Sequence, residues 1–251
     1  MKKIYYLMMC CLAVGLAACS DKDDDKAVDA ENGHESVDLG LTSGTRWATC
    51  NIGATNPQDA GLCFSWAETA KKTSYGGSSY KYLNLSSGNL TKYCYRSDYG
   101  HNGYTDNKSV LDLSDDAARV NWGGAWRTPT EAQLSELINE CFWVWTSDYN
   151  GSDVSGYIVY KAKTSADQGQ VGDSGSPYTL SDTHIFLPYV KNPGSGSSIS
   201  GEDGCCWSST LDPGNPNYAW ALKCTYKNNR RTTTGVIRYD GIPVRGVISG
   251  K

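Results

Sequence analysis

The sequence predicts an α+β protein in which mixed antiparallel sheets dominate and two helices lie near the middle of the chain. Two observations predict this class. Residues 128–141 carry apolar side chains at helical spacing behind a Thr-Pro start, whereas residues 218–226 alternate with the two-residue period of a strand. No segment repeats at a fixed spacing, so residues 37–251 are expected to form a single domain.

The main helix is predicted from its start. Thr128 is placed to cap it, Pro129 suits the first helical position, and Glu131 completes a Thr-x-x-Glu capping box. A shorter helix is expected before it over residues 115–122, where acids suit the N-terminus and two glycines end the helix. Behind the capping box, four apolar residues follow at i, i+3, i+4 and i+7: Leu134, Leu137, Ile138 and Cys141.

Strand patterns lie on both sides of the helices. Residues 37–41 and 46–52 predict a hairpin whose turn is formed by residues 42–45. The polar residues 70–112 lack periodicity and are expected to form a long, partly ordered insertion. Further strands are expected over residues 142–146, 157–161, 184–188, 206–209, 218–226, 235–239 and 243–248.

The N-terminal residues are typical of a targeting segment. Lys2 and Lys3 precede a short apolar run, residues 4–18, which is too short to require a retained membrane span. Residues 16–19, Leu-Ala-Ala-Cys, resemble the lipobox of bacterial lipoproteins. This resemblance implies that residues 1–18 are removed as a signal peptide and that Cys19 is lipidated.

An acidic tether is expected to follow the anchor over residues 19–36. Its run Ser-Asp-Lys-Asp-Asp-Asp, residues 20–25, is similar to the export tag of surface lipoproteins in Bacteroidota. That resemblance implies an outer-membrane, lipid-anchored protein that faces the cell exterior. The alternative is a solvated spacer on a protein retained in the periplasm.

The composition favours recognition at a surface over nucleic-acid binding. The chain has 23 Lys and Arg against 27 Asp and Glu, whereas a nucleic-acid partner requires a basic face. Its 17 Tyr and 8 Trp are amphipathic side chains, which are frequent in extracellular binding surfaces.

The ten cysteines divide into three groups. Cys10 and Cys11 belong to the signal peptide and Cys19 to the lipobox. No Cys-x-x-Cys occurs and the three histidines are far apart, so no zinc site is expected. An odd number remains in the domain, which leaves at least one thiol outside any disulfide. These are Cys50, Cys63, Cys94, Cys141, Cys205, Cys206 and Cys224, of which Cys141 and Cys224 lie in patterns that predict small buried hydrophobes.

Several motifs together resemble one family. They are the segments 37–41, 46–54 and 64–69 near the start, 122–130 (Trp-Gly-Gly-Ala-Trp-Arg-Thr-Pro-Thr) at the centre, and 207–210 (Trp-Ser-Ser-Thr) and 244–247 (Val-Arg-Gly-Val) near the end. This pattern is similar to the Fibrobacter succinogenes major paralogous domain, which occurs on Bacteroidota surface lipoproteins. The resemblance covers about residues 37–248.

The resemblance implies a C-type-lectin-like fold, which the family is thought to share with formylglycine-generating enzymes. The variable proteins of diversity-generating retroelements have the same fold. The resemblance therefore makes the segment of about residues 204–240 a candidate for diversification. Those enzymes hold copper with two cysteines a few residues apart, whereas Cys205 and Cys206 are adjacent here. We therefore expect no catalysis and no cofactor. An oxidase of that enzyme class, or a structural cell-surface or fimbrial component, is the alternative.

The candidate binding face lies in the tail, where strand alternation separates Lys223 and its neighbours from Trp220 and its neighbours. The residues expected to face outward and bind the ligand are Cys205, Cys206, Ala221, Lys223, Thr225, Tyr226, Arg231 and Thr233. Those expected to support them from below are Trp207, Trp220, Leu222 and Tyr239. An ordinary solvated sheet face is the alternative.

The expected partner is an unknown protein or glycan on a host or bacterial surface. Cys205 and Cys206 stand where the family usually has an aromatic residue before Trp-Ser-Ser, which either diversification or drift explains. Calcium-dependent sugar binding is disfavoured because Glu-Pro-Asn and Trp-Asn-Asp motifs are absent, and residues 212–215 are only a turn signal.

Overall fold

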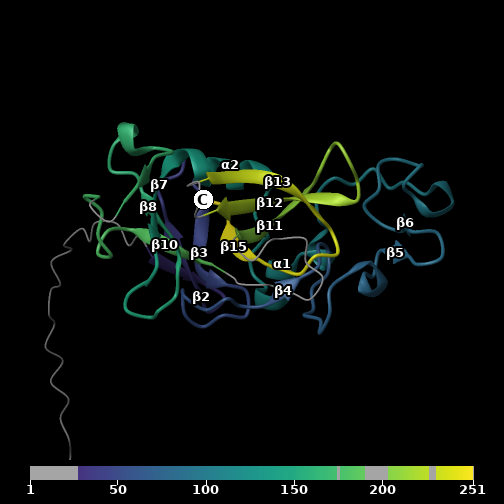
Figure 1. Cartoon of the computed structure of the whole chain (residues 1–251), viewed down its shortest axis with the longest axis horizontal. Helices are drawn as coiled ribbons and strands as arrows, with labels where there is room; N and C mark the ends of the chain where they lie inside the picture. The colour runs from purple at the N-terminus through teal and green to yellow at the C-terminus, as the bar shows by residue number, and fades with distance from the viewer. Residues whose placement is uncertain (1–27, 174–175, 190–202, 226–229, 251) are drawn as a thin grey trace, which may run out of the picture.

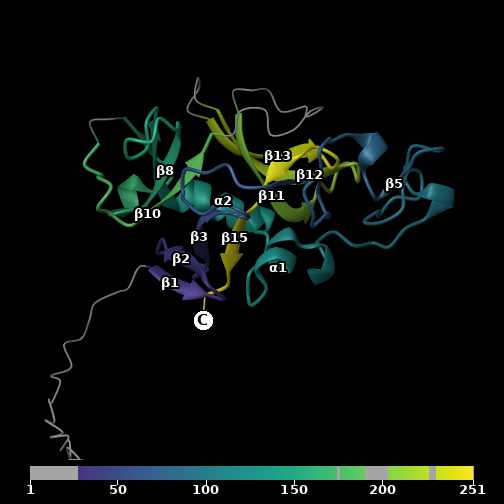
Figure 2. The ribbon, with the colours of Figure 1, turned by 90° about the horizontal axis from the view of Figure 1, so that it is seen from below.

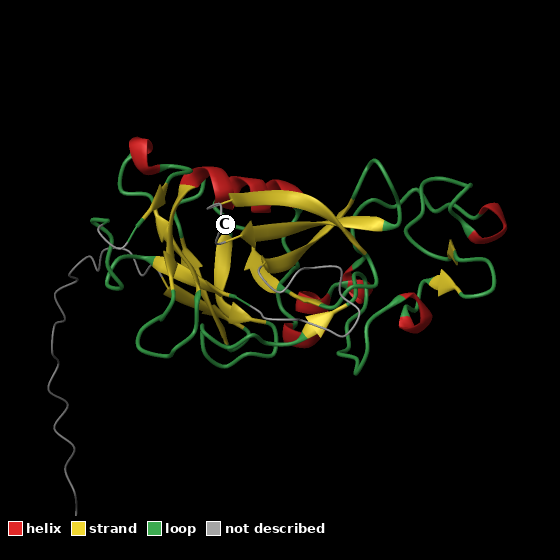
Figure 3. Ribbon diagram, viewed as in Figure 1, coloured by secondary structure: helices red, strands yellow, loops and turns green. Residues whose placement is uncertain are grey.

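The structure is a computed structural model that describes residues 28–173, 176–189, 203–225 and 230–250 (Figure 1). The predicted signal peptide, the lipobox with Cys19, and Tyr226 lie outside these residues. Within them, no helix is both long enough and apolar enough to span a bilayer. The described chain has a mostly antiparallel α+β architecture, which confirms the predicted class (Figure 3).

The first sheet has the order β1-β2-β3-β15, with β1 Val28–Glu31, β2 His34–Asp38, β3 Arg46–Asn51 and β15 Arg245–Ile248. The predicted pairing of the hairpin is confirmed, since β2 and β3 pair with Val37 opposite Trp47. The predicted bounds of its first strand are wrong, because β2 ends at Asp38 and residues 39–41 belong to the connection. Strand β1 was not predicted, and it starts within the residues assigned to the tether. The tight turn between β1 and β2 is Asn32-Gly33, with φ values of 52° and 81° that suit these two residues.

Two further sheets form the rest of the framework. One has the order β10-β8-β7-β9, with β10 His184–Pro188, β8 Gly156–Lys161, β7 Cys141–Thr146 and β9 Val171–Gly172, and its β7–β9 pair is parallel. The tail sheet has the order β11-β12-β13, with β11 Asp203–Leu211, β12 Tyr218–Thr225 and β13 Arg230–Ile237. Two short pairs complete the list: β14 Ile242–Pro243 with β4 Cys63–Phe64, and β5 Leu83–Asn84 with β6 Asn89–Leu90.

Both predicted helices are present, as α1 Ala117–Trp122 and α2 Glu131–Glu140. The predicted cap of α2 is wrong, because Thr130 is the N-cap and its capping box is closed by Gln133. Thr128 is unable to cap α2 because its hydroxyl donates to Asp116, the N-cap of α1. Gly123 ends α1 with a φ of 72°, as the pair of glycines predicted.

Helix α2 packs its apolar stripe between two sheets. Leu134 and Leu137 are fully buried, with Ile138 partly buried beside them, so the stripe is confirmed for these residues. Cys141 is buried in the same cluster, but its placement on the helix is wrong, because it is the first residue of β7. Their cluster includes Trp143 of β7 and Leu222 of β12. In Figure 2, α2 lies between β3 and the tail sheet, near the centre of the molecule.

The insertion over residues 70–112 contributes to the core, although it has little regular structure. Four of its tyrosines are almost completely buried: Tyr75, Tyr80, Tyr82 and Tyr93. Tyr93 packs edge-on against Trp66, with ring centroids 5.1 Å apart. The polar composition of this segment favours an exposed insertion, although tyrosine rings pack in the core while their hydroxyls form hydrogen bonds.

Two arginines near the C-terminus are buried without a carboxylate among their hydrogen-bond partners. Arg238 donates to the carbonyls of Lys92, Tyr93 and Pro216 and to the hydroxyl of Tyr80. Arg245 donates to Asn51 Oδ1 and to the carbonyls of Ala48 and Phe186. Burial lowers the pKa of Arg245 to about 10. These arginines tie the tail to the first half of the chain.

Candidate functional site

The predicted ligand face is divided between the two faces of the tail sheet. In the β12–β13 register, Lys223 lies opposite Thr232, whereas Arg231 lies opposite Cys224 and Thr233 opposite Leu222. Directly opposite residues of an antiparallel pair project to the same face. Arg231 and Thr233 therefore share the face of Leu222 that α2 covers, and Lys223 and Thr225 share the other.

Two predicted ligand residues are core residues. Cys206 is 4% exposed and Ala221 is fully buried, so the prediction that they face outward is wrong. Both faces of the middle of the tail sheet are covered, because Ala221 packs into the cluster of Trp207 while Cys206 packs into the cluster of Leu222. Burial raises the pKa of the Cys206 thiol to about 12. Cys205 is placed in β11 opposite Lys223, and its side chain is outside the described set.

Arg231 and Thr233 are held by neighbouring elements. Arg231 Nη2 donates to the carbonyl of Gly169 at 2.9 Å, and its guanidinium lies 5.3 Å from the ring centre of Trp143. Burial lowers the pKa of Arg231. Thr233 Oγ1 donates to Glu131 Oε1 at 2.9 Å. The structure thus gives these side chains a supporting role, in contrast to their predicted exposure.

Trp220 is the reverse case. It was expected to be a buried support, but it is only half-buried and it lines an open groove of about 450 Å³. On the same face of β12, Leu222 is covered by α2, but that helix begins at Glu131, which itself lines the groove. The indole of Trp220 thus lies beyond the start of the helix that covers its neighbour.

The Trp220 groove is assembled from five parts of the chain. Its walls are Trp220 of β12, Thr210 and Leu211 of β11, Pro213 of the connection between them, Glu131 of α2, and Tyr95 and Ser109 of the insertion. No local pattern predicts Tyr95, Ser109, Thr210 or Pro213 as site residues, because they meet only in the folded chain. Most of the wall is apolar, while three hydroxyls and one carboxylate provide hydrogen-bonding groups.

Hydrogen bonds fix the walls of this groove. Tyr95 Oη donates to the carbonyl of Asp212 at 2.9 Å, and Leu211 N donates to the carbonyl of Ser109 at 2.8 Å. Glu131 N donates to Thr210 Oγ1 at 3.2 Å. The groove is therefore formed before any ligand arrives, and binding would not have to order these elements.

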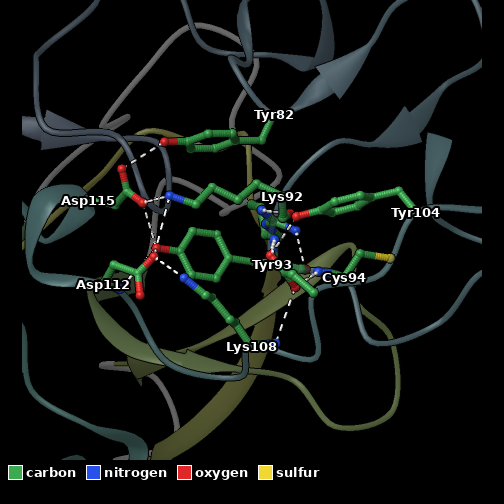
Figure 4. A network of polar contacts seen from close by, with 10 residues as sticks. Tyr82, Lys92, Tyr93, Cys94, Tyr104, Lys108, Asp112 and Asp115 are labelled. Carbon is green, nitrogen blue, oxygen red and sulfur yellow. Dashed lines mark hydrogen bonds and ion pairs between the residues drawn. The ribbon is translucent and has the colours of Figure 1, made fainter.

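A polar network around Asp115 anchors the insertion (Figure 4). Asp115 accepts hydrogen bonds from Tyr82 Oη at 2.8 Å, from Tyr93 Oη at 2.6 Å and from Lys92 Nζ. Burial alone would raise the pKa of the Asp115 carboxyl, but these donors outweigh burial and hold the pKa below its ordinary value. The Asp115 carboxylate is thus a weak base, better suited to holding the insertion than to proton transfer.

The same network fixes the residues next to Tyr95. Asp106 accepts hydrogen bonds from the backbone N–H groups of Tyr93 and Cys94, at 2.7 and 2.9 Å. Burial raises the pKa values of Tyr82 and Tyr93, and the neighbouring Asp115 raises them further. Both hydroxyls therefore keep their protons and act as donors at neutral pH.

Comparison with known proteins adds no relative: no family model, curated protein or solved structure matches the chain. In the part of the chain that the structure describes, no three His, Cys, Asp or Glu side chains are grouped to hold a metal ion. The class that the structure defines is a mostly antiparallel α+β protein with a preformed aromatic groove. The family and the C-type-lectin-like fold stay predictions.

Proposed function

We propose that this chain is a surface-displayed, lipid-anchored binding protein of the Fibrobacter succinogenes major paralogous domain family, with a C-type-lectin-like fold. It recognises a glycan or protein on a host or bacterial surface through the Trp220 groove. The observation that carries this proposal is the partly exposed Trp220, which lines an open groove although its neighbours Ala219, Ala221 and Leu222 are buried. Exposed indoles on rigid elements are common anchors of binding sites.

The lining of the groove supports an uncharged amphipathic ligand. Trp220 and Tyr95 supply flat apolar surface, and Ser109, Thr210 and Glu131 supply hydrogen-bonding groups. No Lys or Arg lines the groove among the described residues, so anionic ligands gain no counter-charge there. This moves the proposed site from the Lys223 face to the opposite face of β12, where Trp220 lies.

The surroundings of Cys206 support binding over oxidase chemistry. Cys206 is 4% exposed and packs among apolar side chains in the Leu222 cluster, and burial raises its pKa, so its surroundings are those of an inert structural thiol. This is the physical reason for preferring a binding protein to an enzyme of the formylglycine-generating class. A purely structural surface component differs from the proposal in having no ligand for the groove.

The binding proposal is tested by substituting groove residues. We expect Trp220→Ala and Tyr95→Ala to abolish binding to glycan arrays and to host or bacterial surface extracts at matched folded fraction. Tyr104→Ala is the matched control, because Tyr104 is an exposed aromatic of the same insertion that does not line the groove. Equal binding by Trp220→Ala and wild type would exclude the groove as the binding site.

The anchorage proposal has its own test. Cys19→Ala should move the protein from the membrane fraction to the soluble fraction, since the lipid-bearing residue is lost. Protease added to intact cells should degrade the wild-type protein. Resistance of the wild-type protein on intact cells would contradict surface display and leave lipidation standing.

A further inference from the structure

The outer edge of β13 has no backbone partner among the described residues. Each of its eight residues pairs with β12 on one side, and no other backbone group of the described chain is hydrogen-bonded to its other side, where the Thr233 carbonyl accepts only from the neighbouring Thr232 Oγ1. The opposite edge of the sheet is different, because Leu111 N donates to Ser209 O and Leu211 N to Ser109 O. In Figure 1, β13 forms the upper margin of the tail sheet. An edge of this length is a template for another strand.

The direction of the N–H groups along β13 follows from one bond. Arg238 N donates to the carbonyl of Asn217 at 3.0 Å, so this N–H points toward the β12 side. N–H groups alternate in direction along a strand. Those of Arg231, Thr233, Gly235 and Ile237 therefore point outward, away from β12.

The sequence of β13 fits an antiparallel copy of itself. With a two-fold axis at Thr233, each copy places Thr233 opposite Thr233, Thr232 opposite Thr234, and Arg231 opposite Gly235. Opposed threonines are favourable cross-strand pairs, and no like charges face each other in this register. Gly235 adds no side chain to this contact, and the Arg231 guanidinium is already held by Trp143 and the Gly169 carbonyl of its own chain, so the opposed threonines carry the register.

Helix α2 provides a second layer for the same contact. Its Ser135 shares the Glu131 carboxylate with Thr233, so this side of α2 adjoins β13. Ala132 and Asn139 lie on the same side at i, i+3 and i+7 spacing and are exposed. These small uncharged side chains permit two copies of α2 to approach. A second layer is needed, because a strand pair alone buries less area than a stable dimer requires.

We propose that two copies of this chain associate through β13, joining their tail sheets into one continuous antiparallel sheet flanked by both α2 helices. The two-fold symmetry closes the assembly as a dimer and leaves no free edge at β13. The Trp220 groove shares Glu131 with this side of α2, but its aromatic walls, Trp220 and Tyr95, belong to neither β13 nor α2.

The test is the mass of the purified chain by sedimentation over a concentration series. We expect a dimer for the wild type. Thr233→Pro removes an outward N–H from each copy and should weaken self-association by about tenfold or more. Thr233→Val is the matched control, because it loses the same hydroxyl contact with Glu131 but keeps the N–H. A monomeric wild type, or a dimer that Thr233→Pro leaves unchanged, would overturn the proposal.

If Thr233→Pro fails to fold, charged substitutions on the other face of β13 provide a second test of the proposed dimer. Thr232→Glu with Thr234→Glu places like charges opposite each other across the two-fold axis, so the chain should be a monomer. Thr232→Glu with Thr234→Lys places opposite charges there, so the chain should dimerise. Within one chain, both variants put the glutamate opposite Lys223, which makes them matched. The same mass for both variants would contradict pairing through β13.

Discussion

The Asp116 carboxylate accepts hydrogen bonds from both the backbone N–H and the hydroxyl of Thr128, at 2.9 and 2.7 Å. The same carboxylate caps α1 by accepting from the N–H groups of Ala118 and Arg119. Asp116 and Thr128 are each 3% exposed. One buried carboxylate thus fixes the start of α1 and the segment that leads into α2.

We expect Asp116→Ala to lower the free energy of unfolding by about 3 kcal/mol or more, because several buried N–H groups lose a charged acceptor. Thr130→Ala should lower the free energy of unfolding by only about 1 kcal/mol, because it removes only the side-chain N-cap of α2. Urea denaturation of the two variants measures the difference. If Thr130→Ala is the more damaging change, Asp116 does not link the two helix starts.

Leu137→Ala should lower the free energy of unfolding by about 2–5 kcal/mol, since Leu137 is fully buried between α2 and the sheets. Val120→Ala is the control, because Val120 is half exposed on α1 and should change stability by about 0.5 kcal/mol at most. Similar urea midpoints for both variants would mean that the buried face of α2 is assigned wrongly.

Arg231→Ala should destabilise the fold, in contrast to the behaviour of an exposed site residue. The guanidinium contacts Trp143 and the Gly169 carbonyl, and losing both should cost about 2 kcal/mol. Lys71→Ala, at an exposed lysine, should keep the wild-type urea midpoint. An Arg231→Ala variant as stable as wild type would restore Arg231 as a candidate ligand contact.

The stability provided by Asp115 should depend on pH in one direction. Its folded-state pKa lies below its ordinary value, so its contribution is present above about pH 4 and is lost as pH falls through the folded-state pKa. Asp115→Asn should therefore be less stable than wild type at neutral pH, with the difference narrowing as the solution is acidified. Urea melts at a series of pH values test this. A difference that stays constant down to strongly acidic pH would contradict the assigned role.

Local sequence determined much of the framework. The α2 stripe, the β2–β3 hairpin and the glycine end of α1 each follow from short-range patterns that the fold retains. The Asn32-Gly33 turn has an equally clear local pattern. The acidic residues before it favour a tether, however, and so hide strand β1. These features need no distant contact, because side-chain periodicity and turn chemistry act within a few residues.

Choices between equal local signals were made by tertiary contacts. The sequence contains two overlapping capping boxes, one starting at Thr128 and one at Thr130. The fold uses the second, because Asp116 binds Thr128. In the same way, Arg238 and Arg245 look like surface residues, but carbonyl groups from distant segments meet them in the core. Most of these partners lie more than a hundred residues away and leave no trace in a local pattern.

The candidate site depended most on tertiary structure. Alternation in β12 correctly separated Ala221 from Trp220, but a period of two states only that the side chains point to opposite faces. Which face is covered depends on what packs there. The Trp207 cluster buries Ala221, while α2 begins too late to cover Trp220. The sequence by itself determined the strand, and only the packing of the insertion, α2 and the tail sheet decided where a ligand has room.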